Sequence, residues 1–360
     1  MLTSSKRQTT PNAHIHGHAI FDNLYLQCPL ALSEGHVNKG VNIEYSLYGD
    51  PGLPVTVVLG GISASREVTQ DGNLLVDKKS RKHGWWQELV GKGKAVNTEQ
   101  TCVLSFNYIP QLSVNTSLGH NQFCLTPTDQ AVILKALLAN LNLNSPITFV
   151  GSSYGGMVGL SFAELFPNSI EQLVCISASD RSTHTARGLR KIQKSLLEIA
   201  SDEKQARDAL SLARQLSILF YRTEEIFKVQ FDDPVPHDSK GQIIGFEQTI
   251  FSYLNHQGGK FAKSFSIDDY SALLDSIDSH SVNASQIQCE CHFIAVPSDR
   301  LVSFDSMRRL AHNVKGLSQF YRLDSIYGHD AFLKEFRSLT KLLKKILGEN
   351  DEPSTSYTSC

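Results

Sequence analysis

The sequence lacks the features that mark several large classes of protein. No uninterrupted apolar stretch approaches the roughly 18 residues of a membrane-spanning helix. The polar N-terminal residues 1–21 contain no apolar core of the kind that a secretory signal needs. Positive charge is not in excess, because 34 lysines and arginines stand against 36 aspartates and glutamates. We therefore expect a soluble, cytoplasmic protein that binds neither a membrane nor nucleic acid.

Cysteine is scarce and does not predict a disulfide framework. The seven cysteines, an odd number, are spread thinly over 360 residues, which fits a reducing compartment. Cys289 and Cys291 form one C-x-C pair with no second pair to complete a ligand set, so we expect no metal site there. The 41% of hydrophobic residues is ordinary for a globular chain.

The order of apolar patterns predicts an α/β fold with a late insertion. Residues 20–180 and 289–348 alternate strand and helix patterns, which is typical of a mostly parallel sheet with helices on both faces. Residues 181–288 contain amphipathic helical stretches and no convincing strand, and we interpret them as a helical lid. The polar residues 1–19, with three alternating histidines, and the tail 349–360 are expected to be disordered.

One short motif carries a candidate nucleophile. Residues 151–155, Gly-Ser-Ser-Tyr-Gly, match the G-x-S-x-G pattern, with an apolar strand pattern directly before them and a helix pattern directly after. A nucleophilic serine in α/β folds sits on such a strand-to-helix turn, where small neighbours allow the tight backbone. Ser153 is therefore the candidate. The alternative is a glycine-rich turn whose serine only caps the helix.

A serine nucleophile needs a base and an acid, which follow it in the chain order Ser, acid, His. His329 is the histidine that stands after the last predicted strand and before the last helix. Asp299 ends the first strand after the insertion, and Asp180 ends the strand before it; we favour Asp299. For the oxyanion we expect the backbone N–H of Tyr154 and a second donor near Gly61 or Ile62.

Several segments together resemble the homoserine O-acyltransferases of the α/β-hydrolase fold. They are GSSYGGMVGL, ALSLARQLSILFYRTEEIFKVQF, FSYLNHQGGKFAKSFSIDDYSALLDSID, AVPSDRLV and YGHDAFLKEF, in this order. The similarity spans about residues 40–348, and general α/β hydrolases do not carry the H-Q-G-x-K-F segment. The resemblance implies acyl transfer from acyl-CoA to the hydroxyl of L-homoserine, a step toward methionine. It also implies a homodimer through the lid and acyl-CoA as a co-substrate, with no bound cofactor.

The resemblance assigns roles to individual residues. Ser153 matches the nucleophile, Asp299 the acid and His329 the base, and three further residues match positions that hold the amino acid: Arg214, Tyr221 and Asp330. Each of the three has a structural alternative. Arg214 could lie on a solvated helix face, Tyr221 could pack in the core, and Asp330 could cap the last helix.

Departures from the acetyl-transferring members indicate the acyl donor. Acetyl-transferring members have a histidine-led A-L-T-G stretch where this chain has LGGISASREV, and a long glycine-rich loop after the next strand that this chain lacks. With GWWQELVGKG (84–93), these departures resemble members that use succinyl-CoA, so we favour succinyl over acetyl. The alternatives are an acetyl-CoA-dependent homoserine or serine O-acetyltransferase, an esterase, and an inactive scaffold used for binding.

Overall fold

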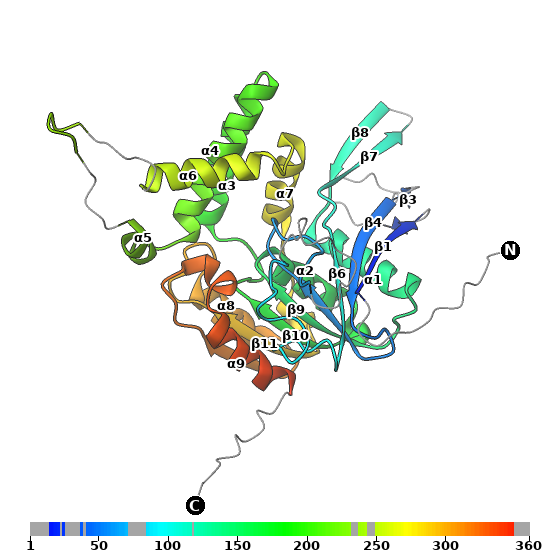
Figure 1. The fold of residues 1–360 in the computed structure, drawn as a ribbon. Coiled ribbons are helices and arrows are strands. Elements are labelled where there is room, and N and C mark those ends of the chain that lie inside the picture. Colours follow the sequence, from blue (N-terminus) through cyan, green and yellow to red (C-terminus); the bar gives the residue numbers. More distant parts are fainter. Residues whose placement is uncertain are drawn as a thin grey trace, which may run out of the picture.

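A mostly parallel sheet forms the centre of the molecule, which confirms the predicted α/β fold (Figure 1). The computed structural model describes residues 14–21, 24–25, 37–38, 41–70, 84–116, 119–231, 237–242 and 249–348. The eight strands of the main sheet are, in spatial order, β1 (His14–Phe21), β4 (Val41–Tyr48), β6 (Cys102–Phe106), β5 (Val55–Leu59), β9 (Ile147–Ser152), β10 (Ile170–Ile176), β11 (Glu290–Ala295) and β12 (Ser318–Arg322). All neighbours from β6 to β12 pair in parallel, whereas β4 is antiparallel to both β1 and β6.

The central strands are apolar on both faces because helices cover both. Successive side chains of a strand point to opposite faces, and Phe149 and Val150 of β9 accordingly belong to two different hydrophobic clusters. The core helices are α1 (Pro127–Asn140), α2 (Tyr154–Leu165), α8 (Phe304–Asn313) and α9 (Phe336–Leu347). α1, α2 and α8 pack in the cluster of Phe149, while α9 and residues 84–96 pack in that of Val150.

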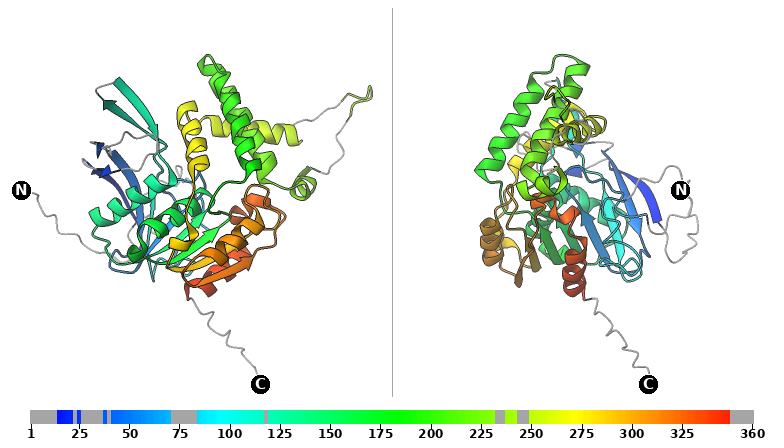
Figure 2. Two further views of the ribbon diagram at one scale, coloured as in Figure 1. Left: turned by 180° about the vertical axis from the view of Figure 1, so that it is seen from behind. Right: turned by 60° about the vertical axis from the view of Figure 1, so that its left-hand side comes forward.

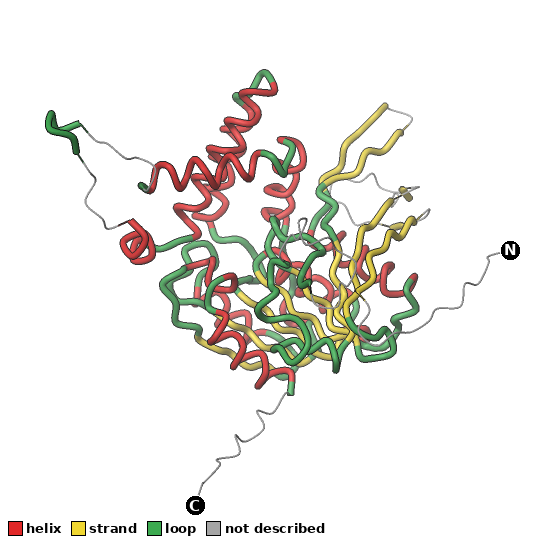
Figure 3. The backbone as a smooth tube through the Cα atoms, viewed as in Figure 1, coloured by secondary structure: helices red, strands yellow, loops and turns green. Residues whose placement is uncertain are grey.

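The insertion between β10 and β11 forms a helical layer over one end of the sheet (Figures 1 and 2). Its helices are α3 (His184–Glu198), α4 (Glu203–Tyr221), α5 (Glu224–Phe231), α6 (Ile250–Ala262) and α7 (Ile267–Ser279). Four of them, α3, α4, α6 and α7, share a small core around Ala213, Phe261 and Tyr270. We call residues 181–288 the lid; Figure 3 shows its described part as helices joined by loops. Among the described residues, no helix is both long and apolar enough to cross a membrane.

One part of the fold differs from the expectation. Residues 14–19 are not part of a disordered arm, because they belong to β1, which pairs with β4 over its whole length. The segment HIHGHAIF has a strand period of two, and Ala19 is buried against the core. The segment after β6 contains an antiparallel hairpin of β7 (Gln111–Thr116) and β8 (Gly119–Cys124). Residues 1–13 and 349–360 lie outside the described residues.

Candidate active site

Ser153 occupies a strained turn between β9 and α2. Its backbone has φ 53° and ψ −119°, a conformation that few non-glycine residues adopt. The flanking glycines permit the turn: a Cβ on Gly151 would lie 2.4 Å from the carbonyl oxygen of Gly155, and a Cβ on Gly155 would lie 2.2 Å from that of Leu59. The sequence thus folds into a tight elbow that presents the serine hydroxyl beyond the end of the sheet.

The candidate nucleophile, base and acid, which are Ser153, His329 and Asp299, form a continuous chain of hydrogen bonds. The Ser153 hydroxyl is 2.8 Å from Nε2 of His329, and Nδ1 of His329 is 2.7 Å from Oδ2 of Asp299. The other oxygen of Asp299 accepts hydrogen bonds from the backbone N–H groups of Leu301 and Val302, at 2.8 and 3.0 Å. The two backbone N–H groups therefore hold Oδ1 of the carboxylate in place, and Oδ2 orients the imidazole.

The sheet brings these residues together because parallel strands end at one edge. Asp299 follows β11, and His329 lies in the short 3-10 helix η4 (Gly328–Leu333) after β12. Asp180, the competing acid, has other partners: it accepts hydrogen bonds from the Ser179 hydroxyl and from Nε of Arg181, both at 3.0 Å. The geometry therefore supports Asp299 as the partner of the imidazole.

The surroundings of His329 raise its affinity for a proton. Burial alone lowers its pKa, but the Asp299 carboxylate, its hydrogen bond and the nearby Asp330 raise the pKa above its ordinary value. Arg190 opposes this weakly through its own positive charge. A histidine with a raised pKa accepts a proton readily, which is what a base beside a serine hydroxyl requires.

The residues expected to donate to an oxyanion lie beside Ser153. Tyr154 is the first residue of α2, so its N–H has no partner within the helix. The turn after β5 passes close to the nucleophile: a Cβ on Gly61 would lie 3.7 Å from Cβ and 3.8 Å from Oγ of Ser153. Ile62 lines the same space as Ser153. The expected donor region therefore adjoins the hydroxyl.

Ser153 opens into a cavity that contains charges of both signs, which we call the bipolar cavity. It is lined by Arg214, Tyr221, Asp330 and His329, among others. The Arg214 guanidinium lies 5.5 Å from the ring centroid of Tyr221 and 5.1 Å from that of Phe261. The structure thus brings together all three residues that the resemblance matched to amino-acid binding.

The structure agrees with the structural alternatives for some of these residues more than for others. Asp330 does not cap the last helix, because it lies within η4 and the residue before the start of α9 is Glu335. Arg214 and Tyr221 line the cavity, and Tyr221 also packs against the hydrophobic cluster of Ala186, Leu189 and Leu301. The sequence reasoning missed Arg222, whose Nε pairs with Oδ2 of Asp330 at 3.0 Å. Arg222 directly follows Tyr221 in the segment FYR, and this position was the sequence signal that could have identified it.

Among the described residues, no three histidine, cysteine or carboxylate side chains are grouped so that they could hold a metal. Cys289 and Cys291 are buried in and beside β11, with their sulfur atoms 3.8 Å apart.

The fold and the elbow define a protein of the α/β-hydrolase class. A family model for the alpha/beta hydrolase fold matches residues 107–336. The crystal structure of homoserine O-acetyltransferase from Bacillus anthracis has a TM-score of 0.77, with 15% identity over 94% of this chain and 99% of that one. The structure of esterase E22 has a TM-score of 0.75, with 17% identity over 93% of this chain and 100% of that one.

Sequence similarity places the chain more narrowly. It is 30% identical to homoserine O-succinyltransferase of Xanthomonas campestris pv. campestris, over 87% of this chain and 81% of that protein. It is 26% identical to homoserine O-acetyltransferase of Moorella thermoacetica, over 90% of this chain and 94% of that protein. The chain belongs to the homoserine O-acyltransferase family within the α/β-hydrolase fold, as its segments predicted.

Proposed function

We propose that the protein transfers an acyl group, preferably succinyl, from acyl-CoA to the hydroxyl of L-homoserine. The observation that carries this proposal is the hydrogen-bonded chain from Ser153 through His329 to Asp299, which opens into a cavity with charges of both signs. An esterase needs the first feature but has no use for a site that fits an amino-acid zwitterion. Membership of the homoserine O-acyltransferase family supports the same choice.

The first half-reaction forms an acyl-serine. His329 accepts the proton of Ser153 at Nε2 while the serine oxygen attacks the thioester carbonyl. The N–H groups of Tyr154 and Ile62 hold the negative oxygen of the tetrahedral intermediate. When the intermediate collapses, the carbon–sulfur bond breaks and the thiolate takes the proton from His329. Free coenzyme A leaves.

The second half-reaction repeats the proton transfers on the acceptor. His329 accepts the proton of the homoserine hydroxyl, whose oxygen attacks the acyl-serine carbonyl. When this intermediate collapses, the bond between the acyl carbon and Oγ of Ser153 breaks, the ester product is released, and the proton on His329 returns to the serine oxygen. In this proposal Arg214 and Tyr221 bind the acceptor's carboxylate and Asp330 binds its ammonium group. Arg222 keeps the Asp330 carboxylate in place.

Water competes with homoserine for the acyl-serine, so the site must limit its access. The lid supplies part of the wall around Ser153, because Arg214 and Tyr221 come from α4. This arrangement lets one set of residues bind the acceptor and cover the intermediate.

Release of free coenzyme A from acyl-CoA, with and without homoserine, tests the proposal. We expect release to continue through many turnovers only when homoserine is present. Equal release in its absence would indicate a hydrolase, and no release from any acyl-CoA would indicate a binding protein. Preference for serine over homoserine would correct the acceptor but not the class of reaction.

Replacement of Arg214 by alanine should impair the second half-reaction alone. A substrate carboxylate left without its partner in the cavity costs about 2–4 kcal/mol, or roughly 30- to 1000-fold in kcat/KM for homoserine. Arg214→Lys should recover only part of this, because an ammonium group cannot form the two-point contact of a guanidinium. The burst of coenzyme A release in single turnover should stay unchanged.

Arg207 provides the matched control on the same helix. It lies in α4, is largely exposed and pairs with Glu203 one turn away, so Arg207→Ala should leave both half-reactions intact. If Arg214→Ala abolishes the burst itself, Arg214 acts in lid structure or donor binding. An unchanged steady state would place it outside the acceptor site.

The pH dependence of kcat/KM should reflect the protonation of His329. Only the neutral imidazole acts as a base, so kcat/KM for the acyl donor should fall about tenfold per pH unit below the pKa of this group. Because Asp299 and Asp330 raise that pKa, we expect the acid limb to have its midpoint above the ordinary value of about 6.5. A midpoint below 6.5 would contradict the electrostatic assignment.

A further inference from the structure

Two tyrosine side chains connect the elbow with the segments around it. The rings of Tyr108 and Tyr154 pack edge to face, with their centroids 4.7 Å apart. Tyr154 begins α2 directly after the nucleophile, whereas Tyr108 follows β6. Tyr108 is not among the residues that line the bipolar cavity. Its role in the site therefore depends on what its hydroxyl group binds.

The Tyr108 hydroxyl donates to the backbone carbonyl of Gly60, at 2.7 Å. The same carbonyl accepts a hydrogen bond from the N–H group of Gly155, at 2.9 Å. Burial raises the pKa of Tyr108 well above its ordinary value, so the hydroxyl keeps its proton and acts as a donor. One donor from α2 and one from the segment after β6 thus fix the direction of a single carbonyl in the turn after β5.

The direction of this carbonyl determines where the neighbouring N–H group points. The peptide bonds of the turn are trans, so the Gly61 N–H points opposite to the Gly60 carbonyl. The Gly61 carbonyl in turn accepts a hydrogen bond from the Ala64 N–H at 2.8 Å, and the Ile62 N–H points opposite to it. Both candidates for the second oxyanion donor are therefore aimed by carbonyls that have hydrogen-bond partners.

The turn needs such support because two successive glycines form it. A Cβ on Gly60 would lie 2.6 Å from Cβ of Ala64 and 2.8 Å from Cη2 of Trp85, so this close approach requires glycine. Glycine gives the backbone wide conformational freedom. An oxyanion donor stabilises the transition state only when it is already aimed. The hydrogen bond from Tyr108 restricts this freedom.

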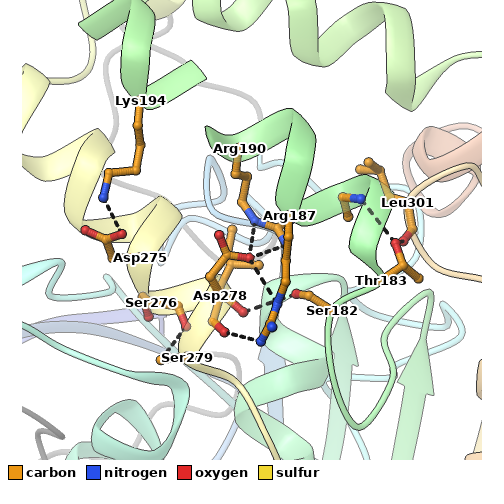
Figure 4. A network of polar contacts seen from close by, with 12 residues as sticks. Ser182, Thr183, Arg187, Arg190, Lys194, Asp275, Ser276, Asp278, Ser279 and Leu301 are labelled. Atoms are coloured by element: carbon orange, nitrogen blue, oxygen red, sulfur yellow. Dashed lines mark hydrogen bonds and ion pairs between the residues drawn. The ribbon is translucent and has the colours of Figure 1, made fainter. Parts of the chain in front are cut away.

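The partner of Tyr108 is itself held by the lid. The Tyr154 hydroxyl lies 2.7 Å from that of Ser276 on α7. Figure 4 shows Ser276 on α7, whose Asp278 pairs with Arg190 of α3 at 2.6 Å. The Tyr154 ring is thus fixed at its backbone by the elbow and at its hydroxyl by a braced lid helix. Tyr108 packs against a ring that is held at both ends.

We propose that Tyr108 is a positioning residue for the oxyanion. Its hydroxyl holds the Gly60 carbonyl and thereby aims the N–H group that the turn after β5 presents to Ser153. The inference rests on the proposed acyl transfer through Ser153 and adds a residue that acts on both of its steps. Each half-reaction places a negative oxygen on the same backbone donors. Loss of the Tyr108 hydroxyl therefore slows both steps by the same factor, whereas loss of a residue that binds one substrate slows one step.

Tyr108→Phe tests this role, because it removes the hydroxyl and keeps the ring that packs against Tyr154. Removal of a whole oxyanion donor costs about 10²- to 10³-fold in rate, and this variant loses only the alignment of one, so we expect a loss of about 5- to 50-fold. The loss should be equal in two single-turnover rates: the burst of coenzyme A release from acyl-CoA, and the breakdown of the acyl-serine on addition of homoserine. Since both steps slow together, steady-state kcat should fall while KM for each substrate changes by less than about twofold.

Tyr48→Phe is the matched control. Tyr48 is buried, and its hydroxyl also donates to a backbone carbonyl beyond β5, that of Arg66, at 3.1 Å. The same hydroxyl accepts a hydrogen bond from the N–H group of Val68. Tyr48→Phe should lower the free energy of unfolding at least as much as Tyr108→Phe does, because it leaves two backbone groups without this partner. Both of its single-turnover rates should stay within about twofold of those of the unmodified protein.

Unchanged rates in a folded Tyr108→Phe overturn the inference. A loss confined to one half-reaction also overturns it, because Tyr108 would then act in the binding of one substrate. A loss of the same size in Tyr48→Phe would show that any loosening of the segment after β5 slows the reaction, and it too would overturn the positioning role.

Failure of the proposed function is read separately, from the unmodified protein. If it releases no coenzyme A from any acyl-CoA, the proposed acyl transfer is wrong. The burst of nitrophenolate from para-nitrophenyl acetate then reports acylation of Ser153 without coenzyme A. An equal burst rate in Tyr108→Phe and in the unmodified protein overturns the inference, and a slower burst in Tyr108→Phe alone supports it. Absence of this burst from the unmodified protein as well overturns both.

Discussion

Replacement of Ser153 by alanine is expected to reduce kcat for acyl transfer by about 10⁴- to 10⁶-fold, because no acyl-enzyme can form. The hydroxyl makes one side-chain hydrogen bond, to His329, so its loss should change the free energy of unfolding by no more than about 1 kcal/mol. The measurements are steady-state release of coenzyme A, the single-turnover burst, and thermal unfolding of the same preparation.

Ser152 provides a control one residue away. Its side chain is buried, and its hydroxyl has no hydrogen-bond partner in the part of the chain that the structure describes. Ser152→Ala should therefore retain activity and should be as stable as the unmodified protein or slightly more so. Retention of more than about a percent of activity by Ser153→Ala would exclude Ser153 as the nucleophile. Loss of activity in Ser152→Ala would show that any change in the elbow is damaging.

The local parts of the site could be predicted from the sequence because their signals are local. A strand pattern, G-x-S-x-G and a helix pattern follow one another without a gap, and the structure contains β9, the elbow and α2 in that order. Asp299 and His329 could be located because each follows a predicted strand, and parallel strands bring such positions to one edge. Neither inference required knowledge of a distant contact.

The contacts of the lid could not be predicted in this way. Arg190 and Asp278 are 88 residues apart in sequence, and their pairing depends on how α3 packs beside α7. An amphipathic pattern shows that a helix has a buried face but not which helix covers it. The pairing of Arg222 with Asp330, 108 residues away, is of the same kind. The sequence therefore located the elbow and the residues at the strand ends better than it located the ion pairs that helices form with distant elements.

Asp299→Asn is also expected to cause a large loss of kcat. The reason is that the two oxygens of the Asp299 carboxylate have different partners. Oδ1 accepts hydrogen bonds from the N–H groups of Leu301 and Val302, so an asparagine will place its carbonyl oxygen there. Its amide NH₂ then faces Nδ1 of His329, where the carboxylate oxygen stood. The imidazole must accept at Nδ1 and carry its proton on Nε2, the atom that faces Ser153. A protonated Nε2 cannot remove the serine proton.

Asp299→Asn should accordingly lower kcat by about 10⁴-fold, the size of the effect in serine proteases whose histidine is held in the wrong tautomer. It should also lower the pKa of His329, because the carboxylate that raises this pKa is gone; the chemical shift of the imidazole protons as a function of pH measures this directly. Asp180→Asn is the matched control, since Asp180 also follows a strand but pairs with Arg181 and Ser179 rather than with His329. It should cost less than about tenfold in kcat. A larger loss from Asp180→Asn than from Asp299→Asn would transfer the role of the acid to the end of β10 and would leave the hydrogen bond between His329 and Asp299 without a part in the reaction.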